Sequence, residues 1–175
     1  MRKYLDKKRK EKEMKKRTKK TLLILTVIFI IAAVSAVNLQ NPYKIESQHA
    51  LAQGSNYANN LQLLARCVNG EARGESYVGQ VAVAAVILNR VDHSSFPNTI
   101  AGVIYQPGAF TAVSDGQIDV PISPNSTVYK ACQDAMNGWD PSGGAIFYYN
   151  PAKTTNKWIY SREVVCRIGN HVFAR

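Results

Sequence analysis

The sequence contains little of what metal and nucleophile chemistry requires. Its 175 residues include three histidines, His49, His93 and His171, and no H-E-x-x-H, H-x-x-E-H or C-x-x-C motif. A zinc peptidase would therefore lack an obvious ligand set, and we expect no metal and no other cofactor. There is no G-x-S-x-G motif, and Gly70 and Gly74 do not form a phosphate-binding loop. We expect His93 and His171 to be exposed or hydrogen-bonded.

Cysteine is equally scarce. Cys67, Cys132 and Cys166 lie far apart and cannot all pair with one another, which excludes a disulfide scaffold. One disulfide remains open, although three small buried side chains fit the pattern better. A thiol–imidazole pair of Cys67 with His171 is a further alternative. It is disfavoured because Cys67 lies within an apolar helical pattern that shows no sign of thiol activation.

Acidic residues are scarce at the N-terminus, and this accounts for nearly all of the net charge of +10. Residues 1–20 hold twelve Lys or Arg and three Asp or Glu, whereas the other 155 residues hold ten basic and nine acidic groups. The positive charge thus belongs to a tail, and the remainder has no bias towards nucleic acid. We therefore expect no nucleic-acid partner.

An uncharged apolar run, 21–37, follows the basic tail directly and is extended slightly by Leu39. As a helix the run would measure about 25 Å, which approaches the thickness of a bilayer core. Because Lys and Arg flank only its N-terminal side, we expect a cytoplasmic N-terminus and an extracytoplasmic remainder. The alternative is a signal peptide cleaved near 34–36, where small residues stand, which would release a secreted protein.

These patterns divide the chain into four segments. We predict a basic cytoplasmic tail at 1–20, a transmembrane anchor at 21–39, a linker at 40–60 with a short helix at 45–52, and a catalytic domain at 61–175. Apolar spacing and strand composition then place the elements of the last segment. The predicted helices are 61–68, 79–91, 100–105 and 127–137, and the predicted strands are 145–149, 164–168 and 171–173. We expect 110–113 to be extended or loop, and the domain to be α+β, mostly helical with a small antiparallel sheet.

Carboxylates are the remaining candidates for chemistry. Glu71 and Glu75 stand in the stretch 69–75 (NGEARGE), which has a glycine before Glu71 and another before Glu75 and lies between two helical patterns. A solvated turn is one interpretation, and the acid group of a glycosidase is the other. Two carboxylates would suit a retaining or an inverting hydrolase. A single acid suffices if the 6-hydroxyl of muramic acid attacks its own anomeric carbon. Arg73 is either an ion-pair partner of Glu75 or part of the site.

Aromatic and amide side chains gather in the last third of the chain, as they do in carbohydrate sites. Clustered aromatic residues also fill hydrophobic cores, so both interpretations stay open. On a strand, Tyr148 and Tyr149 would point to opposite faces, so that one is buried and the other exposed. The candidate residues are Trp139, Phe147, Tyr148, Tyr149, Asn150, Trp158 and Tyr160.

A series of short blocks resembles the spore cortex-lytic cell-wall hydrolases of the SleB/CwlJ type. The resemblance extends from about Leu61 to Arg175, and the number of blocks in one order makes it specific. The blocks are 63–66 (LLAR), 69–75 (NGEARGE), 79–83 (GQVAV), 88–91 (LNRV), 96–100 (FPNTI), 103–111 (VIYQPGAFT) and 168–173 (IGNHVF).

The resemblance implies a lysozyme- or transglycosylase-like core that acts on peptidoglycan glycan strands. It implies that Glu71 is the catalytic acid and base, that the bond between N-acetylmuramic acid and N-acetylglucosamine is cleaved, and that SleB-like members leave 1,6-anhydro ends. A role in spore cortex breakdown during germination follows as an expectation. An amidase or peptidase acting on stem peptides, and a wall-binding module without catalysis, are the alternatives. The predicted substrate contacts are Glu75, Phe110, Thr111, Tyr148, Tyr149, Asn150 and Trp158.

Overall fold

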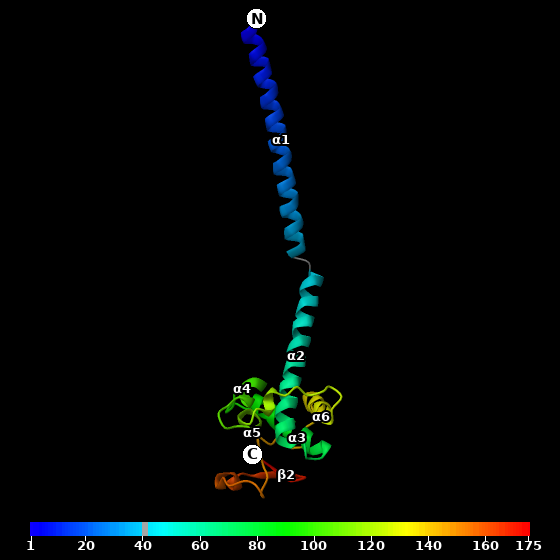
Figure 1. Cartoon of the computed structure of the whole chain (residues 1–175), viewed down its shortest axis with the longest axis vertical. Helices are drawn as coiled ribbons and strands as arrows, with labels where there is room; N and C mark the ends of the chain where they lie inside the picture. Colours follow the sequence, from blue (N-terminus) through cyan, green and yellow to red (C-terminus); the bar gives the residue numbers. More distant parts are fainter. Residues whose placement is uncertain (40–41) are drawn as a thin grey trace. The chain divides into compact units, whose positions relative to one another are not determined.

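The computed structural model describes residues 1–39 and 42–175, and it describes their side chains except those of 2–5, 11 and 31–49. The chain divides into two compact units, Met1–Ala52 and Gln53–Arg175. Figure 1 shows the order of helices and strands along the chain. The second unit contains all three strands and most of the helices.

The first unit is helical. Helix α1 (Arg2–Leu39) contains the predicted basic tail and the predicted span without a break, and α2 (Pro42–Ala72) follows. Within the described side chains no helix combines the length and the hydropathy of a membrane span. The side chains of 31–39, the second half of the predicted anchor, lie outside that described set.

The predicted linker is helical over its described residues, because α2 begins at Pro42 and continues through the predicted short helix at 45–52. Proline is tolerated at the first position of a helix, where its missing N–H has no partner to lose. After Pro42 the segment contains no further proline and one glycine, Gly54, among many good helix formers. Polar composition suggested a linker, although nothing in these residues interrupts a helix.

The helical layer of the second unit agrees with the apolar spacing in the sequence. Besides the end of α2 it contains α3 (Tyr77–Asp92), α4 (Ile100–Ile104) and α6 (Thr127–Met136), which confirms the three predicted helices beyond 61–68. The prediction for 110–113 was wrong, since α5 (Thr111–Ser114) is a single helical turn. The short 3₁₀ helices η1 (Gln117–Asp119) and η2 (Lys157–Ser161) were not predicted.

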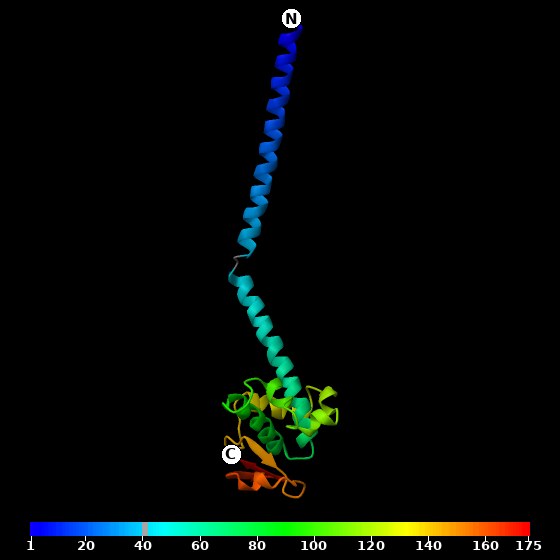
Figure 2. The same ribbon diagram turned by 90° about the vertical axis from the view of Figure 1, so that its left-hand side faces the viewer.

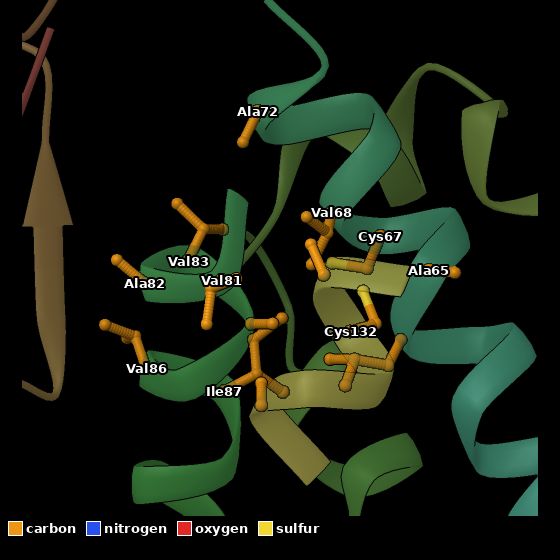
Figure 3. Packing of buried hydrophobic residues seen from close by; sticks show 14 of the residues in the cluster. Ala65, Cys67, Val68, Ala72, Val81, Ala82, Val83, Val86, Ile87 and Cys132 are labelled. Carbon is orange, nitrogen blue, oxygen red and sulfur yellow. The ribbon is translucent and has the colours of Figure 1, made fainter. Parts of the chain in front are cut away.

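Helix α3 forms the centre of the core. Its residues 79–87 are all buried, and its alanines and valines allow α6 to pack closely against it. Figure 3 shows Cys67 and Val68 of α2 and Cys132 of α6 on the side where Ile87 of α3 packs. All three cysteines are free, so the disulfide that the sequence left open is not formed.

A three-stranded antiparallel sheet lies on one side of this helical layer (Figure 2). It consists of β1 (Phe147–Tyr149), β2 (Val164–Ile168) and β3 (His171–Ala174), in the order β1-β3-β2. The central strand β3 is buried at every position, and its Phe173 lies opposite Tyr148 of β1. A tight turn joins β2 to β3 through Gly169, whose φ of +58° suits glycine. All three predicted strands are confirmed.

The N-cap of α6 offers a test of the fold that does not involve any cavity. Ser126 accepts a hydrogen bond from the backbone N–H of Tyr129 at 3.2 Å. We expect Ser126→Ala to lower the free energy of unfolding by about 1 kcal/mol, because that N–H loses its partner. Ser55→Ala, on an exposed face of α2, is the matched control and should cost nothing. Equal stability of the two variants in chemical denaturation would contradict the assigned cap.

Candidate active site

A polar cavity of about 580 Å³ opens where the end of α2 meets α5, β1 and β3. Carboxylates, cations and hydroxyl groups face it together, and both glutamates of the stretch 69–75 are among them. A cavity of this size falls within the range of small-molecule binding sites. Its polar lining residues are Glu71, Arg73, Glu75, Arg90, Thr111, Tyr148, Tyr149, Asn150, Lys153, Thr154 and His171.

Glu71 lies in the last turn of α2, and three donors from two distant segments hold its carboxylate. Its Oε1 accepts from the Thr111 hydroxyl at 2.8 Å and from the Ala112 N–H at 3.0 Å. Its Oε2 accepts from the Tyr148 hydroxyl at 3.1 Å. The N–H groups in the first turn of a helix have no partner within it, so α5 can direct that of Ala112 at Glu71. Since both oxygens are engaged, the orientation of the carboxylate is fixed.

Gly70 explains how α5 comes this close to α2. A Cβ added at Gly70 would lie 2.5 Å from the Cβ of Ala112 and 3.2 Å from its Cα. Such distances are too short for any side chain at position 70. The glycine before Glu71 is therefore a condition for the hydrogen bonds from Thr111 and Ala112, and not a sign of local flexibility.

Glu75 faces the same cavity, but its oxygens are bound elsewhere. Oε2 accepts from the backbone N–H of Asn170 at 3.1 Å, and Oε1 accepts from the Asn170 side-chain amide at 3.0 Å. Burial raises the pKa of Glu75, but these hydrogen bonds, together with His171 in its protonated form and the charge of Lys153, outweigh it, so the pKa lies below its usual value. Glu75 is thus a carboxylate at neutral pH, held by the turn between β2 and β3.

Arg73 does not pair with Glu75, contrary to one of the two expectations for it. Among the described residues its guanidinium donates to the side-chain oxygen of Gln117, next to α5. The nitrogen within ion-pair distance of Glu75 is instead Nδ1 of His171, which lies 3.8 Å from Oε1. Arg73 therefore remains at the cavity as a cation.

The two tyrosines of β1 point to different sides, as strand geometry predicts, but neither is exposed. Tyr149 is buried and Tyr148 is half-buried, so the expectation of one exposed tyrosine was wrong. Burial, followed by the charge of Glu71, raises the pKa of Tyr148 well above its usual value, so its hydroxyl stays a donor to Glu71. Tyr149 is 8% exposed and packs with Ile159 and Val172 in a second, smaller core. Only Tyr148 reaches Glu71, although both residues contribute to the cavity wall.

Two predicted substrate contacts lie elsewhere. Phe110 is 4% exposed and belongs to the core, where its ring lies 5.4 Å from the guanidinium of Arg90. Trp158 is 44% exposed, but it stacks under Arg162 at 4.6 Å and does not line the cavity. Phe110 serves the site indirectly, as the N-cap residue directly before α5. Glu75, Thr111, Tyr148, Tyr149 and Asn150 do line the cavity.

Reasoning from sequence missed the roles of His171 and Asn170 in the site. His171 is 7% exposed, its ring meets that of Tyr148 edge-on at 5.2 Å, and its Nδ1 has no hydrogen-bond partner among the described atoms. The sequence predicted an exposed or hydrogen-bonded histidine. His171 is instead buried, and its Nδ1 has no hydrogen bond among the described atoms. The available signal was the block 168–173, which places both residues directly after a turn glycine.

The structure argues against Cys67 as a catalytic nucleophile. The Cys67 side chain is fully buried in the core, and burial, with a smaller contribution from the Glu71 charge, raises the pKa of its thiol. The thiol therefore stays protonated and does not line the cavity. Within the part of the chain that the structure describes, no three His, Cys, Asp or Glu side chains are grouped to hold a metal ion.

These features define the class of site. A carboxyl group of fixed orientation, facing an open polar cavity, can donate a proton to a bound substrate and take one back. An α+β domain that presents one such group, while its second carboxylate is bound by a turn, is built for general acid–base chemistry.

The chain belongs to the cell wall hydrolase family, whose model matches residues 74–174. It is 58% identical over 117 residues to a spore cortex-lytic enzyme of Bacillus cereus, covering 67% of this chain and 44% of that protein. A spore cortex-lytic enzyme of Bacillus subtilis is 53% identical over 135 residues, or 75% of this chain and 44% of the relative. The chain thus spans less than half the length of these two relatives.

Solved structures show the same fold. The catalytic domain of the germination-specific lytic transglycosylase SleB from Bacillus anthracis superposes with a TM-score of 0.63 at 57% identity, covering 67% of this chain and 94% of that domain. The catalytic domain of the Bacillus cereus SleB protein gives 0.64 at 58% identity, covering 67% and 91%. The predicted α+β fold of the catalytic domain is therefore confirmed.

Proposed function

We propose that this protein cleaves the glycosidic bond between N-acetylmuramic acid and N-acetylglucosamine in peptidoglycan, with Glu71 as the catalytic acid and base. The observation that carries the proposal is the carboxylate of Glu71, which faces the cavity and is held by Thr111, Ala112 and Tyr148. Family membership and the names of the relatives support the same substrate.

The second carboxylate supports a lytic transglycosylase rather than a hydrolase. Retaining and inverting glycosidases need a second carboxylate, either to attack the sugar or to activate a water molecule. The nearest candidate in the sequence, Glu75, has both oxygens bound to Asn170. A mechanism with a single acid needs no second free carboxylate, which is consistent with this arrangement.

In that mechanism Glu71 first donates its proton to the oxygen of the departing N-acetylglucosamine, as the bond to C1 of muramic acid breaks. The 6-hydroxyl of the same muramic acid then attacks C1, and its proton passes to Glu71. One bond at C1 replaces another, the acid is regenerated and no water is consumed. Thr111, Ala112 and Tyr148 keep the carboxyl oriented through both steps.

Mass spectrometry of digested sacculi tests the proposal directly. Purified full-length protein should release muropeptides that end in 1,6-anhydromuramic acid from both vegetative and cortex peptidoglycan. Reducible muramic acid ends without any anhydro form would make the protein a hydrolase. Free stem peptides would indicate an amidase or a peptidase, and binding to sacculi without release would indicate a wall-binding module. Activity confined to cortex peptidoglycan would show that the enzyme requires the muramic δ-lactam of cortex.

We further propose that the N-terminal segment anchors the protein in the cell membrane, with the second unit outside, and that it serves spore cortex breakdown during germination. The basic tail beside an apolar run supports the anchor, and the names of the relatives support the role. After cell fractionation, the intact chain should be found in the membrane fraction and should remain there after alkaline washing. A soluble chain whose N-terminus begins near residue 37 would show a cleaved signal peptide instead.

A further inference from the structure

We infer that Glu75 is a positioning residue: through Asn170 it fixes the turn between β2 and β3, and thereby holds His171 and Tyr148 where Tyr148 can donate to Glu71. The inference rests on the proposed role of Glu71. It assigns Glu75 a function that depends on hydrogen-bond geometry and not on proton transfer.

The first step is the attachment of the turn. Glu75 accepts from both the backbone and the side chain of Asn170, at 3.1 and 3.0 Å. A Cβ added at Gly169 would collide with Oε2 of Glu75, so the carboxylate packs against the turn backbone itself. Asn170 is thus held by two hydrogen bonds in a turn where a side chain at 169 would displace the Glu75 carboxylate.

The second step leads from the turn to the tyrosine. His171 follows Asn170 and opens β3, and its buried ring meets the Tyr148 ring edge-on at 5.2 Å. Tyr148 is also held by β3 through its pairing with Phe173. Because the Tyr148 hydroxyl is 3.1 Å from Glu71, a displacement of the turn is transmitted to that hydrogen bond through one ring and one strand.

Hydrogen bonds, and not an ion pair, make this attachment. Burial is the largest influence on His171 and lowers its pKa. The charges of Glu75 and Glu71 raise the pKa by less and that of Lys153 lowers it, so the pKa lies below its usual value and the ring is neutral at pH 7. Glu75 therefore holds the turn through Asn170, while the neutral ring of His171 transmits the position.

Two substitutions at position 75 separate positioning from proton transfer. In Glu75→Gln the amide oxygen still accepts from the Asn170 N–H. The Asn170 amide can turn over to accept from the new NH₂ group, so both hydrogen bonds survive. We expect this variant to stay within about threefold of wild-type activity, and Glu75→Ala to lose about tenfold, in kcat rather than KM. A catalytic carboxylate would make both variants as inactive as Glu71→Gln.

A charge exchange provides the matched rescue. Asn170→Asp places two carboxylates opposite each other and should lower the rate at least as far as Glu75→Ala does. The double variant Glu75→Gln with Asn170→Asp restores a donor opposite an acceptor, so its rate should return to within about threefold of wild type. This series remains informative if Glu75→Ala does not fold, because each of its members keeps a polar side chain at both positions.

The route through the tyrosine is tested with Tyr148→Phe. If Glu75 acts through Tyr148, adding Glu75→Ala to Tyr148→Phe should lower kcat by less than twofold, whereas independent effects would multiply. Multiplied effects, wild-type activity of Glu75→Ala, or an inactive Glu75→Gln would each overturn the inference. If the wild-type protein releases no glycan fragments, the proposed function fails instead, so the two failures are distinguishable.

Discussion

Glu71→Gln should abolish the release of glycan fragments, lowering the initial rate by about 10²- to 10⁴-fold. The amide has the size and shape of the carboxyl group, and its oxygen still accepts from Thr111 and Ala112. The Tyr148 hydroxyl can rotate to accept from the new NH₂ group. The substitution therefore removes the exchangeable proton and little else, and the free energy of unfolding should change by less than about 1 kcal/mol.

Glu163→Gln is the matched control, since it makes the same chemical change at an exposed residue outside the cavity. Its rate on sacculi should equal that of the wild type. Full activity of a folded Glu71→Gln protein would refute the assignment of the acid. A folded Glu71→Gln protein that binds sacculi without cleaving them would agree with it, and could serve to trap bound glycan.

Gly70→Ala should lower activity by about 100-fold, although Gly70 has no side chain that could take part in the reaction. The added methyl would lie 2.5 Å from the Cβ of Ala112, so α5 must move away from α2. A displacement of about 1 Å at a reacting group can cost about 100-fold in rate. Forcing the two helices apart should also lower the free energy of unfolding by about 1–3 kcal/mol.

Gly54→Ala provides the control, because it is the same substitution in the same helix and a Cβ there would meet nothing within 4 Å. It should raise stability by up to about 1 kcal/mol, since alanine favours helix over glycine, and leave activity unchanged. Enzyme kinetics and thermal unfolding of both variants measure the predicted effects on activity and stability. Wild-type kinetics for Gly70→Ala would show that the approach of α5 to α2 does not matter for catalysis.

The elements that could be predicted from the sequence are those whose residues show apolar spacing or strand composition. Helix α3 was visible in its apolar spacing, and all three strands were visible in their composition. Helix α5 was not, because four residues are about one turn and no periodicity can show in so short a segment. The continuation of α2 through 42–60 was missed because the polar composition of this segment is that of a linker.

Some residues of the candidate site could likewise be predicted from the sequence, and others could not. Glu71 was selected as a candidate from its block and the resemblance, but its hydrogen-bond partners lie 40 to 77 residues away along the chain, beyond the reach of any local pattern. One of them is a backbone N–H, which carries no residue identity at all. Phe110 was expected at the cavity but lies in the core, because aromatic side chains serve cores and sugar sites alike, and only packing distinguishes the two. Trp158 lies outside the cavity, where its exposed ring packs against Arg162.

The strand order also bears on when the protein becomes active during its own synthesis. Strand β3 follows β1 and β2 in the sequence yet lies between them, so β1 has no strand to pair with until β3 has been made and inserted. Until then Tyr148 lacks its support, and the Glu71 carboxylate lacks one of its three donors. We expect a nascent chain that still lacks β3 to be inactive.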